Sequence, residues 1–70
     1  MSAVRKYSVT LDGHRTSLSL EPEFWAAFRD LCQARNRRPI QVLGEIDRAR
    51  NGNLSSAVRV WVLNALTERR

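Results

Sequence analysis

A two-residue turn signal between two alternating runs constrains the first third of this chain more than any other feature. Asp12-Gly13 tolerates the positive φ angles that a type I′ turn requires. Residues 5–11 and 14–20, on either side, alternate between apolar and polar side chains. A turn at this place sets Tyr7 opposite Leu18 and gathers the apolar side chains of both runs on one face. The sequence therefore predicts a β-hairpin.

The other face of the predicted hairpin is polar, basic and built mostly from short side chains. Its members are Lys6, Ser8, Thr10, Arg15, Ser17 and Ser19. Two alternatives stay open for the first run: residues 1–12 either supply an extra strand or form a flexible arm that orders only in a dimer or on a ligand. His14, beside the turn, is expected to face solvent or to have a structural role rather than bind a metal.

The next segment is typical of a helix that runs to about Arg35. Proline at a first helical position with acidic neighbours, as in Glu21-Pro22-Glu23, favours a helix start because acids complement the helix dipole. Apolar residues then recur at helical spacing: Phe24, Trp25, Ala27, Phe28, Leu31 and Cys32. This spacing predicts an apolar face wide enough to cover a sheet, with Cys32 as a small buried hydrophobe.

Two further helices are expected in the second half of the chain. Pro39 opens one that runs from Ile40 to about Ala49. We expect its inward side chains to be Ile40, Leu43 and Ile46, with Val42 as an addition. Asn53 is a candidate N-cap for a third helix from Leu54 to Thr67, which is apolar around much of its circumference. Such a helix needs more than one neighbour, so self-association is expected.

The length and composition narrow the function classes. We expect residues 1–70 to form a single small domain, which is too small for a deep catalytic pocket, so no enzymatic activity is predicted. One cysteine, Cys32, excludes an intramolecular disulfide, and with one histidine it is too little for a zinc site. No metal or cofactor is therefore expected, and oligomerisation is the remaining way to stabilise so small a fold.

The charge balance favours an acidic partner. The chain has 12 Lys and Arg against 7 Asp and Glu, a net charge of +5, and eleven of its cations are arginine, which pairs bidentately with phosphate and guanine. No run is long and apolar enough for a membrane span, and the first residues lack the apolar core of a signal peptide. We expect a cytoplasmic protein without a membrane partner.

The order of a strand, a helix, a tight basic turn and a second helix resembles the ribbon-helix-helix proteins. The most specific stretches are residues 13–25 and 53–63, which are similar to a compact bacterial branch with a further helix after the two-helix core. The resemblance spans about residues 13–66. It implies an α+β, mostly helical fold and an intertwined homodimer, in which residues 14–20 of two chains pair antiparallel into a ribbon that enters the DNA major groove.

The resemblance also implies roles for individual residues. Base contacts come from Arg15, Ser17 and Ser19, while Thr16, Leu18 and Leu20 pack on the helices. The resemblance places DNA backbone contacts at the start of the second helix, at Ile40 and Gln41 behind Arg37 and Arg38. Lys6 lies outside the resemblance, but it shares a hairpin face with Arg15, so we expect it to contact the DNA backbone or to lie in the adjacent groove. The expected dimer core comprises Leu18, Leu20, Trp25, Phe28, Leu43, Ile46 and Trp61. Many members have a glycine and a serine or threonine cap where this chain has residues 37–41, so arginine side chains are expected to take over part of the phosphate contact.

Two function hypotheses follow. The first is a sequence-specific, double-stranded-DNA-binding homodimer that acts as a transcriptional repressor and that could associate further on DNA. The alternative is a protein-interaction module or an antitoxin-like dimer that binds another protein through its third helix or first strand. The few residues after the third helix are shorter than the toxin-binding tail usual in such antitoxins. Arg15, Ser17 and Ser19 discriminate between the hypotheses, because only the first needs them for DNA binding.

Overall fold

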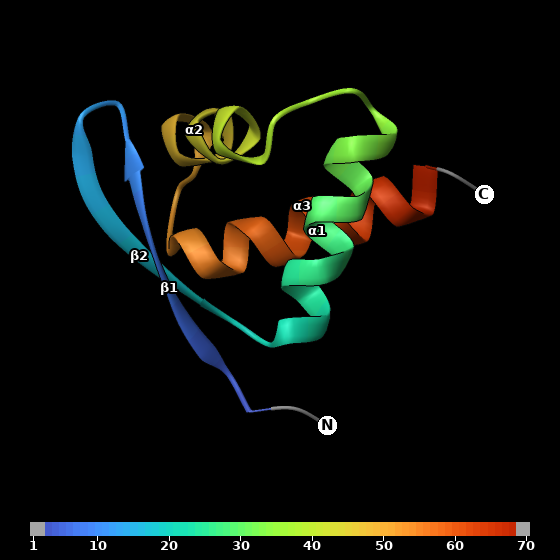
Figure 1. Ribbon diagram of the computed structural model, residues 1–70, viewed down its shortest axis with the longest axis horizontal. Coiled ribbons are helices and arrows are strands. Elements are labelled where there is room, and N and C mark those ends of the chain that lie inside the picture. Colours follow the sequence, from blue (N-terminus) through green and yellow to red (C-terminus); the bar gives the residue numbers. More distant parts are fainter. Residues whose placement is uncertain (1–2, 69–70) are drawn as a thin grey trace.

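The computed structural model describes residues 3–68, which form a hairpin followed by three helices (Figure 1). The elements are β1 (Arg5–Leu11), β2 (His14–Leu20), α1 (Pro22–Ala34), α2 (Pro39–Ala49) and α3 (Leu54–Glu68). Every predicted element is present, and the observed bounds differ from the predicted ones by a residue at one end of each helix. The α+β, mostly helical fold expected from the sequence is confirmed.

The hairpin has the predicted register. The two strands pair antiparallel with Tyr7 opposite Leu18 and Ser8 opposite Ser17. Asp12 (φ 51°) and Gly13 (φ 81°) both adopt positive φ, as a type I′ turn requires. The first run is therefore a strand of the same sheet within one chain, and not an arm that needs a partner to order.

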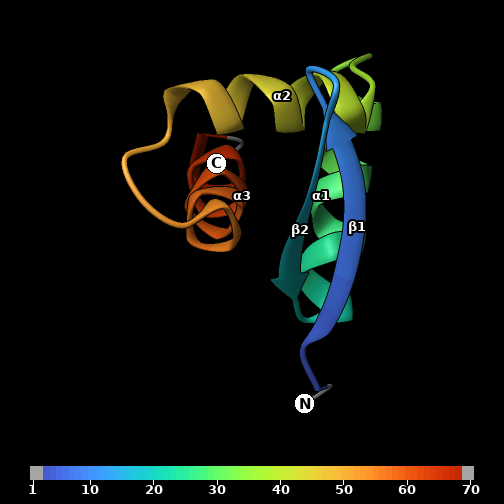
Figure 2. The ribbon, with the colours of Figure 1, turned by 90° about the vertical axis from the view of Figure 1, so that its left-hand side faces the viewer.

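The helices lie on one side of the hairpin and cover its inner face (Figures 1 and 2). From the sheet, the side chains of Leu11, Leu18 and Leu20 are buried. From the helices, the core includes Phe28, Leu31, Cys32, Val42, Leu43, Ile46, Leu54, Val58, Val62 and Ala65. Each element thus contributes to a core that one copy of the chain completes.

A series of aromatic rings joins the sheet to two helices. Tyr7 of β1 stacks on Trp25 of α1, with ring centroids 4.7 Å apart. Trp25 stacks in turn on Phe28 at 5.7 Å, and Phe28 meets Trp61 of α3 edge-on at 5.2 Å. Offset stacked and edge-to-face pairs are the geometries that aromatic rings favour. Both tryptophans therefore have packing roles, as their helical spacing indicated.

Backbone hydrogen bonds end α1 in a Schellman motif. Asn36 has a left-handed backbone (φ 59°), and its N–H donates to the Gln33 carbonyl at 3.0 Å. The Arg37 N–H donates to the Cys32 carbonyl at 2.8 Å, which completes the motif. Asparagine tolerates this conformation better than most residues. It thereby serves where glycine is usual, three residues before Pro39, at which α2 begins.

The predicted cap of α3 is confirmed, and one inward residue of α2 is corrected. The Asn53 side chain accepts a hydrogen bond from the Ser56 N–H at 3.0 Å, which is the N-cap geometry. Ile40 was expected to face the core, but its side chain is 45% exposed. At 3.6 residues per turn it lies more than a quarter-turn from the centre of the face that Val42, Leu43 and Ile46 bury.

Helix α3 buries one face and exposes the other. Leu54, Val58, Val62 and Ala65 are buried. Val60, Leu63 and Leu66 keep about half or more of their surface exposed, at 54%, 61% and 48%. Within one chain, α3 packs against α1, α2 and β2, and the side that carries these three residues stays uncovered. Over residues 3–68, no helix combines the length and apolar character that a membrane crossing needs.

Candidate nucleic-acid interface

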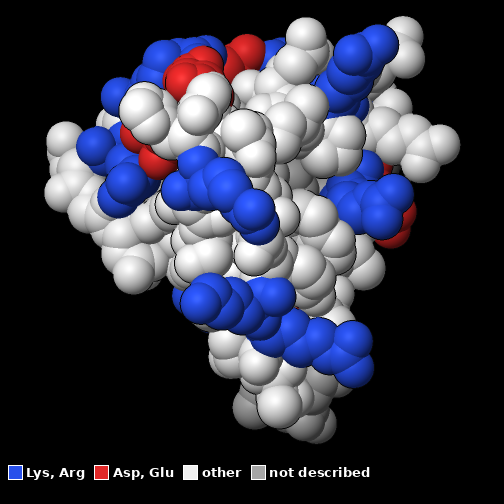
Figure 3. Space-filling model, turned by 60° about the vertical axis from the view of Figure 1, so that its left-hand side comes forward, with Lys and Arg blue, Asp and Glu red and all other residues white. Residues whose placement is uncertain are grey.

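The outer face of the hairpin gathers the residues predicted to contact bases. Arg15 lies opposite Thr10, Ser17 opposite Ser8 and Ser19 opposite Lys6, and paired residues in an antiparallel sheet point to the same side. These side chains are exposed except for that of Ser19, which is half-buried. Figure 3 shows lysine and arginine side chains across this side of the molecule.

Both basic side chains on this face, Lys6 and Arg15, lack an acidic partner among the described residues. Five arginines elsewhere form ion pairs: Arg35, Arg37, Arg48, Arg50 and Arg59. Lys6 and Arg15 form none with any residue between 3 and 68, and neither do Arg5, Arg29 and Arg38. Because no carboxylate neutralises Lys6 or Arg15, the outer face has a positive field that favours a polyanion.

Four of the residues predicted to contact phosphate lie at the start of α2, and they differ in how far their charges and N–H groups are already paired. Arg38 precedes the helix and has no carboxylate partner among the described residues, whereas Arg37 forms an ion pair with Glu45. Ile40 and Gln41 are exposed. The Gln41 N–H already donates to the Arg38 carbonyl at 3.1 Å. Arg38 and the Ile40 N–H are therefore the donors best placed for a phosphate here.

An ion pair that the sequence did not reveal ties the hairpin turn to α2. Arg48 donates from Nη1 to both carboxylate oxygens of Asp12, at 3.1 and 3.0 Å. Asp12 occupies the turn, so this pair fixes the tip of the hairpin relative to the helix, although both side chains are more than half exposed. An exposed pair contributes about 0–1 kcal/mol, so its effect is on position more than on stability.

A second unpredicted cluster ties the other end of β2 to α3. The Ser19 N–H donates to Ser55 Oγ at 2.8 Å, and Arg59 donates to the Ser19 carbonyl at 3.2 Å. Arg59 also donates to the Glu21 carboxylate at 3.1 and 3.2 Å, and its guanidinium lies 5.7 Å from the centre of the Phe24 ring. A backbone hydrogen bond, followed by that of Arg59, lowers the pKa of Glu21 below its ordinary value.

The thiol of Cys32 shows no sign of chemistry. It is fully buried, and burial raises its pKa despite the opposing charges of Arg37 and Arg35. The thiol therefore stays protonated and packs as a small hydrophobe, as predicted. His14 is exposed beside the turn. Across residues 3–68, no three histidine, cysteine or acidic side chains cluster as metal ligands would.

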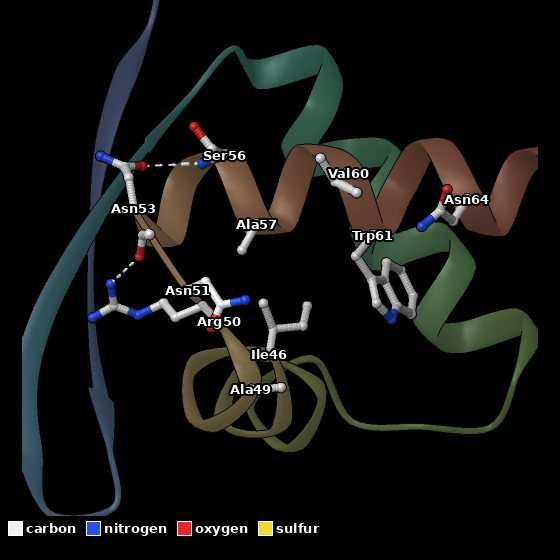
Figure 4. Close-up of a pocket in the computed structure, with 11 residues that line it drawn as sticks. Ile46, Ala49, Arg50, Asn51, Asn53, Ser56, Ala57, Val60, Trp61 and Asn64 are labelled. Atoms are coloured by element: carbon white, nitrogen blue, oxygen red, sulfur yellow. Dashed lines mark hydrogen bonds between the residues drawn. The ribbon is translucent and has the colours of Figure 1, made fainter.

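An open hollow of about 570 Å³ lies between the end of α2 and α3 (Figure 4). Ile46 and Ala49 line it from α2, and Ala57, Val60 and Trp61 line it from α3. Arg50 is the one charged side chain in its lining, so the hollow offers no acid–base pair. Its apolar walls fit packing against another surface better than chemistry on a bound molecule.

The residues predicted for a dimer core already pack within one chain. Leu18, Leu20, Phe28, Leu43 and Ile46 are buried, and Trp25 and Trp61 are half-buried among them. A single copy accounts for their burial. Their place in the core of a dimer stays a prediction.

The architecture defines a class of small α+β domain in which a short ribbon, polar on its outer face, is backed by helices. A family model described as a ribbon-helix-helix domain matches residues 4–66, so the chain belongs to the ribbon-helix-helix domain family. This family is one of DNA-binding regulators that generally act as dimers. No curated protein and no solved structure matches the chain significantly.

Proposed function

We propose that this chain binds double-stranded DNA sequence-specifically as a homodimer, with the ribbon in the major groove, and represses transcription by occluding its site. The observation that carries the proposal is the outer face of the hairpin, where Arg15 has no acidic partner and lies among short polar side chains. A face of this kind lets one long side chain reach past its neighbours to a base edge.

The chemistry of these side chains suits base recognition. Arginine donates two parallel hydrogen bonds to guanine O6 and N7, an arrangement that discriminates against other bases by about 1–3 kcal/mol. Ser17 and Ser19 donate to or accept from either kind of base. We assign base contacts to Arg15, Ser17 and Ser19, with Ser19 the most restricted because its backbone is bound to α3.

The spacing of paired strands agrees with this assignment. In the proposed dimer the two copies of β2 are the central strands; neighbouring strands lie about 4.8 Å apart, and the major groove, about 12 Å wide, admits such a two-stranded ribbon. We assign phosphate contacts to Lys6 at the edge of this face and to residues at the start of α2. These are Arg37, Arg38, Ile40 and Gln41, among which Arg38 has the least compensated charge.

The homodimer is supported by the family and by the exposed apolar side chains of α3. Val60, Leu63 and Leu66 are large hydrophobics that water contacts in the single chain. We expect a second copy to cover apolar surface of this kind and to pair its strand with β2. In the intertwined arrangement, the core residues named above would also line the dimer contact.

A second candidate is a module that binds another protein. The apolar face of α3 and the hollow beside it support this alternative, because both offer exposed hydrophobic surface without a covering element. It predicts that changes at Arg15 leave function intact, whereas changes at Leu63 abolish it.

Fluorescence anisotropy on duplexes selected from a random pool tests the proposal. We expect Arg15→Ala to reduce the preference for the selected site by a factor that corresponds to about 1–3 kcal/mol. Arg15→Lys keeps the charge but lacks the planar fork, so it should lose most of the same preference. Arg29→Ala, which removes an exposed and unpaired charge from α1, is the matched control and should keep it.

The salt dependence of binding separates phosphate contacts from base contacts. Each phosphate contact contributes about −0.9 to the slope of log K against log salt, so Arg38→Ala should reduce that slope by about one while keeping the site preference. If the pool yields no preferred site and Arg15→Ala changes nothing, DNA recognition by the hairpin is wrong and the protein-binding alternative stands.

A further inference from the structure

The outer edge of β2, turned away from β1, has hydrogen-bonding groups of its own. Facing residues of an antiparallel pair alternate between those that bond to each other and those whose backbone groups point outward. The two-residue turn makes Leu11 and His14 a hydrogen-bonded pair. Every second residue from there, namely Arg15, Ser17 and Ser19, therefore points its backbone N–H and C=O groups away from β1. The contacts of Ser19 with α3 agree with this alternation.

Helix α3 covers one end of this edge. It takes both backbone groups of Ser19, through Ser55 Oγ at 2.8 Å and Arg59 Nη2 at 3.2 Å. No residue between 3 and 68 bonds the outward groups of Arg15 and Ser17. Figure 2 shows β2 between β1 and α3, and the hydrogen bonds of Ser19 place α3 at the part of the strand that leads into α1. Of the three outward-pointing residues, Ser19 is thus covered, and Arg15 and Ser17 are open.

A second copy of β2 fits the same edge symmetrically. A two-fold axis through Ser17 pairs Ser17 with its counterpart, and pairs Arg15 of each copy with Ser19 of the other. The backbone groups of Ser19 therefore take part in two of the three hydrogen-bonded pairs of such a ladder. With α3 in place, only the central Ser17 pair can form.

We propose that α3 and a second copy of the chain compete for the outer edge of β2; this inference rests on the homodimer proposed above. Neighbouring strands lie about 4.8 Å apart, and Ser55 already occupies hydrogen-bonding distance from Ser19, so both cannot bind there together. The first two turns of α3, residues 54–60, cap the edge in the single chain and withdraw when the ribbon forms.

Arg59 makes most of the contacts that hold α3 against this end of β2. It binds the Ser19 carbonyl and the Glu21 carboxylate and lies over the Phe24 ring, all at the junction of β2 and α1. Withdrawal of α3 breaks these contacts and leaves Arg59 as a further unpaired cation at the end of the ribbon. Until then the cap shields one end of an edge that could otherwise pair with unrelated strands.

Disulfide trapping tests the competition. In a Cys32→Ala background, Ser17→Cys places one thiol in each copy at the central pair, where Cα atoms about 5.5 Å apart suit a disulfide. The initial rate of crosslinking in oxidised glutathione is measured with α3 unchanged, with Arg59→Gln and with Ser55→Ala. We expect Arg59→Gln to raise the rate at least fivefold and Ser55→Ala to raise it by a smaller factor.

Matched variants control for charge and for folding. Arg50→Gln removes the same charge from an arginine that does not contact β2, and Ser56→Ala changes an exposed neighbour of Ser55. Both should leave the rate unchanged. Circular dichroism melting shows whether Arg59→Gln folds, and Ser55→Ala, the smaller change, carries the test if it does not.

The outcomes separate this inference from the proposed function. Equal crosslinking rates with and without the cap substitutions overturn the competition and leave the homodimer standing. Rapid crosslinking of Ser8→Cys on β1, in place of Ser17→Cys, also overturns it, because the copies then meet at the other edge. A monomer by light scattering without any crosslink overturns the homodimer as well, whereas the anisotropy measurement decides sequence-specific DNA binding by itself.

Discussion

The two faces of β2 differ more than any other pair of neighbouring surfaces in this molecule. On the inner face, Leu18 and Leu20 are 1% and 0% exposed and contact helices. On the outer face, Arg15 and Ser17 are exposed and contact no other side chain by hydrogen bond or ion pair across residues 3–68. Stability and the proposed recognition are therefore one residue apart along the strand, and substitutions on one face should leave the other property intact.

The largest expected effect comes from the inner face. Leu18→Ala removes a fully buried side chain and leaves a cavity, which should lower the free energy of unfolding by about 2–5 kcal/mol. Urea denaturation followed by circular dichroism measures this loss. In a domain of 70 residues such a loss is a large fraction of total stability.

Ser17→Ala is the neighbouring control on the outer face. Its stability should stay within about 0.5 kcal/mol of the parent, as is usual for exposed positions. A loss at Ser17 comparable with that at Leu18 would contradict the separation of the two faces.

An intermediate effect is expected at the turn that sets both faces. Gly13 has φ +81°, and an added β-carbon would meet no atom within 4 Å, so Gly13→Ala isolates the backbone cost. We expect a loss of roughly 1–2 kcal/mol in the free energy of unfolding, from the left-handed conformation alone. Thermal melting at matched concentrations measures it.

Gly52→Ala serves as the matched glycine control. That position also has open space around it but does not have a positive φ. Alanine there should leave the free energy of unfolding unchanged or raise it by up to about 1 kcal/mol, because it lowers the conformational entropy of the unfolded chain. If the two alanine variants melt alike, the turn does not require glycine.

The smallest effect is expected from pH, at the junction of β2 and α1. Because the pKa of Glu21 is lowered in the folded chain, its carboxylate contributes stability above the ordinary value of 4.5. That contribution is lost as pH falls from 4.5 through the lowered pKa. Melting temperatures between pH 7 and pH 3 should therefore fall less steeply for Glu21→Gln than for the parent. Parallel curves would show that Glu21 is not linked to folding.

Local patterns sufficed to predict most of the fold. The hairpin register depends on the Asp12-Gly13 turn and on a period of two, and both are properties of adjacent residues. The cap at Asn53 is local in the same way. The prediction for Ile40 was wrong. This residue lies in the first turn of α2, one residue after the helix begins, and a single apolar side chain there does not define which face of the helix is buried.

The candidate site was only partly predictable, because whether an arginine there is paired or free depends on acidic residues far away in the sequence. Arg15 was identified by parity within the hairpin. The partners of Arg48 and Arg59, Asp12 and Glu21, lie 36 and 38 residues away in the sequence, and no local pattern connects them. Nor did the sequence indicate that Ser19 would be bound to α3, since α3 lies outside the local strand pattern.

The ring stack from Tyr7 to Trp61 gives the molecule an optical consequence. Aromatic chromophores held in fixed, close geometry couple their transitions, so the near-ultraviolet circular dichroism of this chain should report on the docking of β1 against α1. Trp25 touches the strand through Tyr7, whereas Trp61 belongs to α3 and lies beside Phe28. Replacing one indole at a time by phenylalanine would thus give two built-in spectroscopic probes, one that monitors the hairpin and one that monitors the third helix.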